Sequence, residues 1–192
     1  GTNCYRLIHA EGDNLPGLII DIYAKTAVVQ CHSIGMYQAI DKISQALKYT
    51  LKEKLVSIYC KSASTLPSSF AATMEDHYLF GAKTDSIATE NGQHFQIDWE
   101  SGQKTGFFLD QRDNRQLLAQ YANGKNVLNA FSYTGGFSIY ALKAGAKQVD
   151  SVDVSALAIS TLEQNLELNE IDKGNHHSYT ADVLKYLNDC PM

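Results

Sequence analysis

The carboxyl-terminal half of the chain alternates strand-like segments with helical ones, and this alternation restricts the folds open to it. Strands are predicted at 127–130, 148–153 and 177–180, and a helical pattern follows each of them. Strands separated by helices pair in parallel through right-handed crossovers. This half is therefore predicted to form a parallel α/β sheet of about three strands.

Helices are expected around these strands. Ile159, Leu162 and Leu166 recur on one face, which is the spacing of a helix that packs on a sheet. A further helix should precede the first strand, with Asp110 as its cap. The helices are expected at 137–143, at 155–168, from 183 to 187, and in the segment that carries Leu117, Leu118 and Tyr121.

The amino-terminal half reads as a separate α+β domain, so the predicted domains are 1–98 and 99–192. Its strands are expected at 5–9, 17–23, 27–31, 56–60, 77–80, 86–90 and 94–98. Asn91-Gly92 predicts a hairpin turn between the last two, and the serine-rich stretch 62–69 predicts a loop. One amphipathic helix is expected from the spacing of Met36, Ile40, Ile43, Leu47 and Leu51.

Composition excludes some classes of protein. Hydrophobic residues make up 44% of the 192, but no apolar run is long enough for a spanning helix, and residues 1–10 do not resemble a signal peptide. No membrane association is expected. The four cysteines (Cys4, Cys31, Cys60 and Cys190) are scattered, which predicts reduced thiols in the cytoplasm and no metal site.

The charge balance limits how the chain could contact a nucleic acid. The net charge is −5, divided by direct count into −2 before residue 99 and −3 after it. Nucleic-acid binders usually carry a basic surface. Any RNA contact must therefore be local, or be supplied by another part.

A glycine turn follows the first strand of the α/β half, in the segment Asn126-Val-Leu-Asn-Ala-Phe-Ser-Tyr-Thr-Gly-Gly-Phe137. Gly135 and Gly136 allow the chain to turn without a side chain in the path of a ligand, and the next helix directs its amides toward the turn. This is the layout of a nucleotide-type cofactor site at the carboxyl end of a strand. An ordinary strand-to-helix turn is the alternative, because short glycine motifs are weak signals.

Two acids favour the cofactor interpretation. Asp153 ends the next strand, where a carboxylate can accept both ribose hydroxyls. Asp182 follows the third strand, near the expected position of an adenine amine. The alternative is that both acids cap helices, and the two roles are compatible.

The composition of the turn discriminates between cofactors. It lacks the Gly-x-Gly-x-x-Gly pattern that accommodates a pyrophosphate. S-adenosylmethionine has no phosphate, and its sulfonium and amino-acid tail suit polar and aromatic surroundings. Such groups are supplied by Asn129, Phe131, Ser132, Tyr133 and Thr134.

A second motif precedes the glycine turn, Gly102-Gln-Lys-Thr-Gly-Phe-Phe-Leu-Asp-Gln-Arg-Asp-Asn-Arg115. Together with Glu11-Gly-Asp-Asn-Leu-Pro-Gly-Leu18, the two motifs resemble the S-adenosylmethionine-dependent ribosomal-RNA large-subunit cytosine-5 methyltransferases in order along almost the whole chain. The resemblance implies a Rossmann-like methyltransferase domain, incomplete here, behind a domain that contacts RNA. The implied cofactor site comprises Gln103, Lys104, Thr105, Asn129, Phe131, Ser132, Tyr133, Thr134, Gly135, Asp153, Ser155 and Asp182.

The resemblance also implies methyl transfer to carbon 5 of a cytosine in ribosomal RNA. A cysteine thiolate must first add to carbon 6 of a base extruded from its helix. In the family this cysteine and the loop that holds the base would follow Met192, so no catalytic residue is expected in this chain, and the chain alone should be inactive. Cys190 precedes Pro191, the reverse of a Pro-Cys catalytic pair.

Three further expectations remain open. An incomplete sheet leaves a strand edge unpaired, which favours a homodimer or a partner chain at that edge. A related RNA methyltransferase acting on a guanine nitrogen is the nearest alternative, since the glycine turn and the segment Gln103-Lys-Thr-Gly106 also occur in such relatives. A non-catalytic RNA-binding or assembly protein is the alternative from another class.

Overall fold

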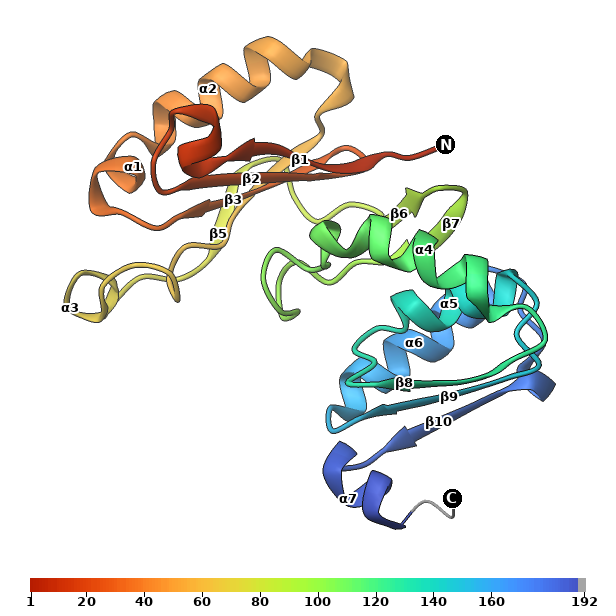
Figure 1. Cartoon of the computed structure of the whole chain (residues 1–192). Helices are drawn as coiled ribbons and strands as arrows, with labels where there is room; N and C mark the ends of the chain where they lie inside the picture. The colour runs from red at the N-terminus through yellow and green to blue at the C-terminus, as the bar shows by residue number, and fades with distance from the viewer. Residues whose placement is uncertain (190–192) are drawn as a thin grey trace. The chain divides into compact units, whose positions relative to one another are not determined.

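The computed structural model describes residues 1–189, and the chain divides into two compact units (Figure 1). The first unit comprises residues 1–90 and 97–109, and the second comprises residues 91–96 and the segment from 110 onward. The division falls later than the boundary predicted at residue 98. Lys104 and Thr105 lie in the first unit, where they are hydrogen-bonded to strand residues Gln30, Asp21 and Tyr23. No helix in the described part of the chain is long and apolar enough to span a membrane.

A five-stranded mixed sheet forms the centre of the first unit, with the strand order β1-β2-β3-β4-β5. Its strands are β1 (Cys4–His9), β2 (Leu18–Tyr23), β3 (Thr26–Cys31), β4 (Ser57–Cys60) and β5 (His77–Phe80). β3 and β4 pair in parallel and the other neighbours pair antiparallel. A parallel pair needs a crossover connection, which the helical segment between β3 and β4 supplies. The five strands predicted for this region are confirmed.

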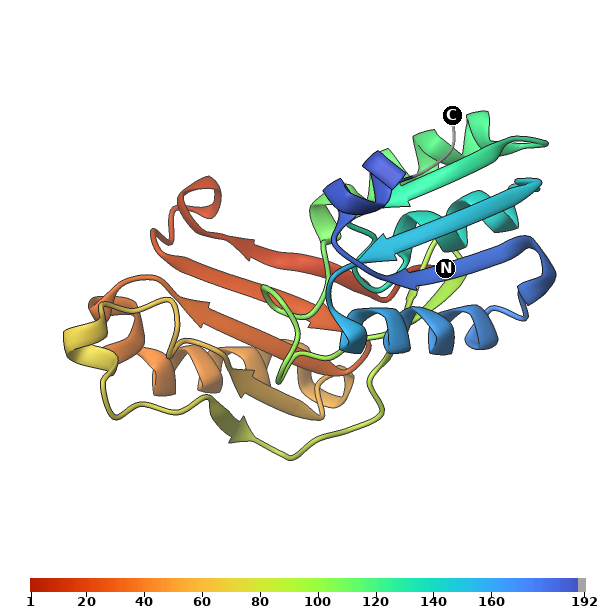
Figure 2. The ribbon, with the colours of Figure 1, turned by 90° about the horizontal axis from the view of Figure 1, so that it is seen from below.

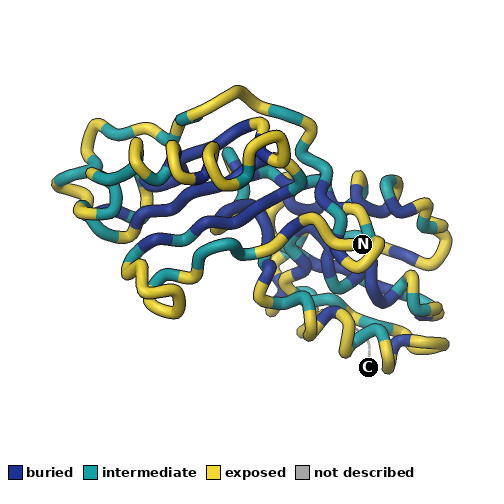
Figure 3. Tube along the Cα trace, turned by 90° about the horizontal axis from the view of Figure 1, so that it is seen from above, coloured by how far each residue is buried: buried dark blue, intermediate teal, exposed yellow. Residues whose placement is uncertain are grey.

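Two helices, α1 (Ile34–Gln38) and α2 (Ile40–Leu51), lie on one face of this sheet (Figure 1). The expected single helix is therefore wrong in detail, because the backbone leaves helical geometry at Ala39 (ψ 7°). Leu47 of α2 belongs to one buried cluster with sheet residues such as Ile20 and Ile58. Figure 3 shows the strands of this unit as largely buried, whereas the outer side of the helices is exposed.

Residues that favour turns determine the connections between elements in this region. β6 (Ile87–Glu90) and β7 (Gln93–Gln96) form a hairpin, and Asn91 and Gly92 both have positive φ, as a two-residue hairpin turn requires. The loop predicted at 62–69 is partly helical, since α3 (Ser68–Ala71) begins directly after Pro67. Short 3-10 turns occur at η1 (Ala10–Asp13) and η2 (Lys52–Lys54).

The second unit contains a three-stranded parallel sheet with the order β10-β9-β8. Its elements are α4 (Arg112–Ala122), β8 (Asn126–Ala130), α5 (Gly136–Lys143), β9 (Gln148–Asp153), α6 (Ala156–Leu168), η4 (Lys173–Asn175), β10 (His176–Thr180) and α7 (Val183–Asp189). Within this unit, α5 and α6 lie on one face of the sheet and α7 lies on the other (Figures 1 and 2). The predicted alternation of strand and helix is confirmed, as is the buried face of α6, where Leu162 and Leu166 are fully buried.

The predicted cap of α4 is wrong. Asp110 lies inside a 3-10 turn, η3 (Leu109–Gln111), and Gln111 is the residue at the cap position, without a side-chain hydrogen bond to the helix. Of the apolar residues that predicted this helix, Leu117 and Tyr121 are exposed.

Candidate cofactor site

The loop of residues 131–135, which we call the cofactor loop, joins β8 to α5 in an irregular conformation. Phe131 and Tyr133 have φ of 59° and 47°, a region that non-glycine residues rarely adopt, and Gly135 has φ of 80°. Such residues cost about 1–3 kcal/mol each and persist only where the surroundings hold them. Here the Ser132 amide donates to the carbonyl oxygen of Val152 at 3.0 Å, and the Gly135 amide donates to the carbonyl oxygen of Ser132 at 2.9 Å.

Asp153 ties this loop to the end of β9. Its Oδ2 accepts a hydrogen bond from the Tyr133 amide at 2.8 Å, and its Oδ1 accepts one from the Ser155 amide at 2.9 Å. Asp153 does not cap α6, because Ser155 does so by accepting from the Ala158 amide. A carboxylate offers about four acceptor positions, so two remain for ligand hydroxyls.

Two hydroxyl groups of the loop are buried without a partner among the described residues. They are Ser132 Oγ and Thr134 Oγ1. Buried polar groups almost always have partners, and a native exception calls for an explanation such as a missing ligand. Hydroxyls can both donate to a carboxylate and accept from an ammonium, which are the two groups of the S-adenosylmethionine tail. The residues present therefore fit this cofactor.

Gly135 is required for a steric reason as well as for its φ. A Cβ on this residue would lie 2.5 Å from Cγ of Leu162, a buried residue of α6. The loop thus rests directly on α6. Gly136, by contrast, starts α5 with no positive φ, so only the first glycine of the predicted pair makes the turn.

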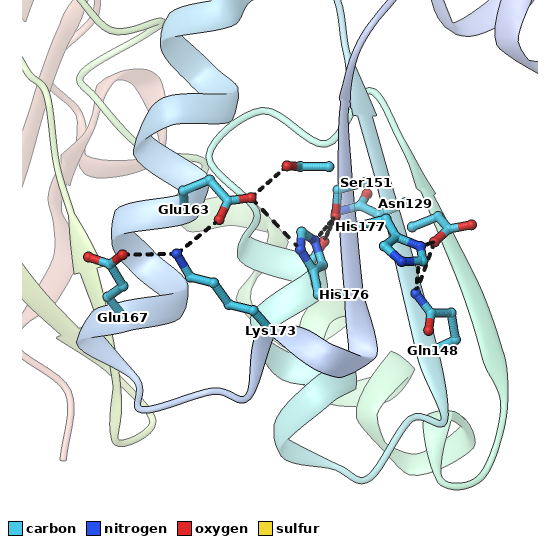
Figure 4. Close-up of polar contacts among 11 residues, drawn as sticks. Asn129, Gln148, Ser151, Glu163, Glu167, Lys173, His176 and His177 are labelled. Atoms are coloured by element: carbon cyan, nitrogen blue, oxygen red, sulfur yellow. Dashed lines mark hydrogen bonds and ion pairs between the residues drawn. The ribbon is translucent and has the colours of Figure 1, made fainter.

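A series of hydrogen bonds between polar side chains connects β8, α5, β9 and β10, and it begins at Asn129, just before the cofactor loop. Asn129 Nδ2 donates to Ser138 Oγ at 2.7 Å, Ser138 Oγ lies 2.7 Å from Ser151 Oγ, and Ser151 Oγ lies 2.8 Å from His176 Nε2. On the other side of its ring, His176 Nδ1 faces Glu163 Oε1 at 4.0 Å (Figure 4). These hydrogen bonds fix the side chain of Asn129 at the carboxyl end of β8.

The donors and acceptors in this series of hydrogen bonds can be assigned from its first and last members, Asn129 and His176. Asn129 Nδ2 can only donate, so Ser138 accepts from it, and every hydroxyl hydrogen has an acceptor when His176 Nε2 accepts from Ser151. His176 is then neutral, with its Nδ1 hydrogen toward Glu163. Burial lowers the pKa of His176, and the nearby Glu163 opposes that shift only in part. The adjacent His177 is exposed and contacts Asp150, so the two histidines face opposite ways.

Asp182 and Ser155 have capping roles. Asp182 Oδ1 accepts from the Lys185 amide at 2.9 Å in the first turn of α7. The Asp182 interpretation as a helix cap is therefore confirmed, and it leaves the other carboxylate oxygen for a ligand. Asp153 and Asp182 follow adjacent parallel strands, and the Ala181 amide donates to the Asp153 carbonyl oxygen at 3.0 Å.

The second motif is held in the first unit by buried polar contacts. Lys61 Nζ donates to the carbonyl oxygen of Gly102 at 2.5 Å, and burial lowers the pKa of this lysine. Thr105 Oγ1 donates to Asp21 Oδ2 at 2.5 Å and lies 2.8 Å from the hydroxyl of Tyr23. Thr105 is fully buried with its hydroxyl engaged, so any contact with the cofactor's tail would use its backbone.

Gln103 and Lys104 differ from Thr105 because both are exposed. The Lys104 ammonium lies 4.2 Å from the ring centre of Phe108, which orients it. All three residues of this segment belong to the first unit, whereas the cofactor loop belongs to the second. Their participation in one pocket stays a prediction.

The three cysteines within the described residues have no feature of a nucleophile. Cys4, Cys31 and Cys60 are buried and form no disulfide, and burial raises the pKa of Cys60 and raises that of Cys31 to about 11. Cys190 lies outside the described residues. Within residues 1–189, no three His, Cys, Asp or Glu side chains gather as metal ligands would.

Sequence reasoning missed the residues that support the loop from below. Asn165 of α6 is fully buried and donates through Nδ2 to the carbonyl oxygen of Thr134 at 2.8 Å. Ser138 and Ser151 were likewise not predicted. A signal existed for Asn165, because it interrupts the apolar face that Leu162 and Leu166 define, and a buried amide needs partners.

A parallel sheet with a bent loop after one strand and acids after the next two defines an α/β cofactor-binding domain. Residues 67–188 match the family model described as "S-adenosylmethionine-dependent methyltransferase". The chain belongs to this family of enzymes, whose cofactor is S-adenosylmethionine. The glycine turn and the absence of a pyrophosphate pattern thus predicted the cofactor correctly.

Individual relatives are consistent with this assignment. "Ribosomal RNA large subunit methyltransferase I" of Aeromonas salmonicida is 43% identical over 189 residues, covering 97% of this chain and 47% of that protein. A solved structure from Streptococcus mutans, described as a candidate SAM-dependent methyltransferase, is 30% identical with a TM-score of 0.85, covering 97% of this chain and 48% of that one. Another, a candidate methyltransferase solved with SAH, has the same identity and TM-score and covers 97% and 47%. The chain spans about half the length of the curated relatives it matches.

Proposed function

We propose that this chain is the cofactor-binding part of an enzyme that methylates carbon 5 of a cytosine in large-subunit ribosomal RNA. The observation that carries the proposal is its similarity to proteins named ribosomal RNA large subunit methyltransferase I, at 43% identity over 97% of the chain. The segment from Gly102 to Arg115 supports it, because this segment resembles the cytosine-5 family residue for residue over its whole length.

S-adenosylmethionine supplies a methyl group on a sulfonium when it is bound. In the proposed site Asp153 accepts the ribose hydroxyls, Asp182 contacts the adenine amine, and Ser132 and Thr134 bond the amino-acid tail. Asn129, Tyr133, Gly135 and Ser155 shape the strand end around it, and the exposed ring of Phe131 faces the cofactor. For Gln103, Lys104 and Thr105, a role near the tail is proposed from the family resemblance of their segment alone.

The nucleophile is proposed to lie in the part of the relatives that this chain does not span. Attack on cytosine carbon 6 requires a thiolate. The buried thiols of Cys31 and Cys60 are held protonated at neutral pH, since burial raises both pKa values. This chain is therefore proposed to bind cofactor without performing the transfer.

The first unit is proposed to contact the RNA. Its lysines at positions 25, 52 and 54 are exposed on neighbouring turns, and none is paired with a carboxylate within the described residues. Lysines of this kind bind phosphates without sequence preference. Such a local basic region is compatible with an overall charge of −5.

A homodimer is proposed through the sheet of the second unit. β8 pairs only with β9 there, so one side of β8 is an edge among the described strands, and Leu128 on it is 43% exposed. An open edge is a template for pairing with another chain. Light scattering of the purified chain at increasing concentration tests this, and a monomer at every concentration would contradict it.

Nucleoside analysis tests the function. The 192-residue chain, and a longer protein in which the remaining carboxyl-terminal part of the Aeromonas salmonicida relative follows residue 192, are each incubated with protein-free ribosomal RNA and labelled S-adenosylmethionine. We expect 5-methylcytidine from the longer protein and no transfer from the 192-residue chain, although both bind the cofactor. Label on a guanine nitrogen would overturn the cytosine assignment, and cofactor binding without transfer by either protein would support a non-catalytic role.

A further inference from the structure

A side chain of α6 holds the cofactor loop by a hydrogen bond to the carbonyl oxygen of Thr134. Asn165 Nδ2 donates to it at 2.8 Å, and Asn165 Oδ1 accepts from the backbone amide of Gln96 in β7 at 2.7 Å. Asn165 is fully buried. The side-chain nitrogen of Asn165 is therefore bonded to the cofactor loop, and its side-chain oxygen is bonded to β7 of the hairpin.

The same face of α6 also packs closely against Gly135, the residue after Thr134. Leu162, one turn before Asn165, occupies the space that a side chain on Gly135 would need. The peptide between Thr134 and Gly135 is thus fixed at both sides, by a hydrogen bond to its carbonyl and by close packing on its α-carbon. Rotation of this peptide would also turn the Gly135 amide away from Ser132, to which it donates.

We infer that Asn165 is a positioning residue for S-adenosylmethionine, which it never touches, because it sets the conformation of the loop that carries Ser132 and Thr134. The inference rests on the proposed assignment of this loop to the cofactor. The hydroxyls of Ser132 and Thr134 face a ligand only while the peptide between Thr134 and Gly135 keeps its orientation.

Asn169 provides a matched control one turn further along α6. Its Oδ1 accepts from the His94 amide at 2.9 Å, and its Nδ2 donates to the His94 carbonyl oxygen at 2.6 Å. Asn169 therefore bonds β7 as Asn165 does, is nearly as buried, and has no hydrogen bond to the loop among the described contacts. The same substitution at either position places an oxygen against a backbone carbonyl.

The test uses Asn165→Asp and Asn169→Asp in the 192-residue chain, with S-adenosylmethionine titrated calorimetrically across a range of pH. An ionised carboxylate keeps the acceptor for Gln96 but cannot donate to Thr134, whereas a protonated one can. For Asn165→Asp we expect about tenfold weaker binding at alkaline pH, equivalent to the loss of one such hydrogen bond, with recovery as the pH falls. Wild type and Asn169→Asp should agree within about twofold.

Equal affinity of Asn165→Asp and wild type at alkaline pH would overturn the inference, and so would an equal loss in Asn169→Asp. If wild type itself does not bind the cofactor, the cofactor assignment fails instead. Hydrogen–deuterium exchange of residues 131–137 in the unliganded chain then decides the positioning role. Faster exchange in Asn165→Asp than in Asn169→Asp supports it, and equal exchange overturns it.

Discussion

Asp153 Oδ2 accepts a hydrogen bond from the backbone amide of Tyr133 at 2.8 Å, so the acid at the end of β9 fastens the loop at the end of β8. This bond links two adjacent parallel strands at the edge where a cofactor is expected. It gives Asp153 two roles, because the same carboxylate that shapes the loop can also accept the ribose hydroxyls.

We therefore expect Asp153→Ala to weaken S-adenosylmethionine binding by about 1.5–3 kcal/mol, the range for hydrogen bonds to a charged group. Isothermal titration calorimetry measures it. Asp172→Ala is the matched control, since Asp172 also accepts from a backbone amide, that of Gly174 at 2.9 Å, but precedes β10 rather than following a strand. Unchanged affinity in Asp153→Ala, or equal loss in the control, would remove Asp153 from the site.

Gly135→Ala should destabilise the second unit more than Gly124→Ala. Both glycines have positive φ, near 80° and 70°, so both substitutions carry the conformational cost of about 1–2 kcal/mol. Only at Gly135 would the new Cβ meet Leu162, and overpacking adds about 1–3 kcal/mol. Urea denaturation gives the two values. A Leu162→Ala change should reduce the cost of Gly135→Ala in a double-mutant cycle, and strict additivity would argue against the contact.

Folding stability should fall with acidification through His176. Burial lowers the pKa of His176 in the folded chain below its ordinary value of 6.5, so between these two pKa values the unfolded chain binds a proton that the folded chain does not. Stability is then fully present above about pH 6.5 and declines below it, by up to about 1.4 kcal/mol per pH unit. The difference between wild type and His176→Gln in urea denaturation across pH isolates this proton. The exposed His177→Gln serves as control, and a dependence that survives in His176→Gln would assign it to other groups.

Regular patterns made most of the fold predictable. The 3–4 spacing of Ile159, Leu162 and Leu166 gave α6, and Asn91-Gly92 gave the hairpin turn, because each signal is local. The break of the expected helix at Ala39 and the cap at Gln111 could not be read locally, since tertiary packing decides such ends. The boundary at residue 98 missed the hydrogen bonds of Thr105 to Asp21 and Tyr23, which join residues more than eighty positions apart in the chain.

The residues of the candidate site at the strand ends were predictable, and the residues that support them from the interior were not. Asp153 ends a strand, and Gly135 and Asp182 follow strands, so their placement follows from topology alone. The hydrogen bond from Asn165 to Thr134, and the series of hydrogen bonds that links Asn129 to His176, could not be predicted in this way. Both depend on which side chains of separate elements meet in the interior. Polar residues within apolar patterns mark such positions without naming their partners.

The three thiols within residues 1–189 should be unreactive in the folded chain. Cys4, Cys31 and Cys60 are buried, and burial raises the pKa of Cys31 to about 11, so little thiolate is present at neutral pH. In a Cys190→Ser variant, which removes the one thiol outside the described residues, N-ethylmaleimide should label the native chain slowly and the urea-unfolded chain completely, as read by intact mass. The same variant should transfer no labelled methyl group to protein-free ribosomal RNA. Transfer that is abolished by Cys31→Ser or Cys60→Ser, together with rapid labelling of that thiol, would place the nucleophile in this chain after all.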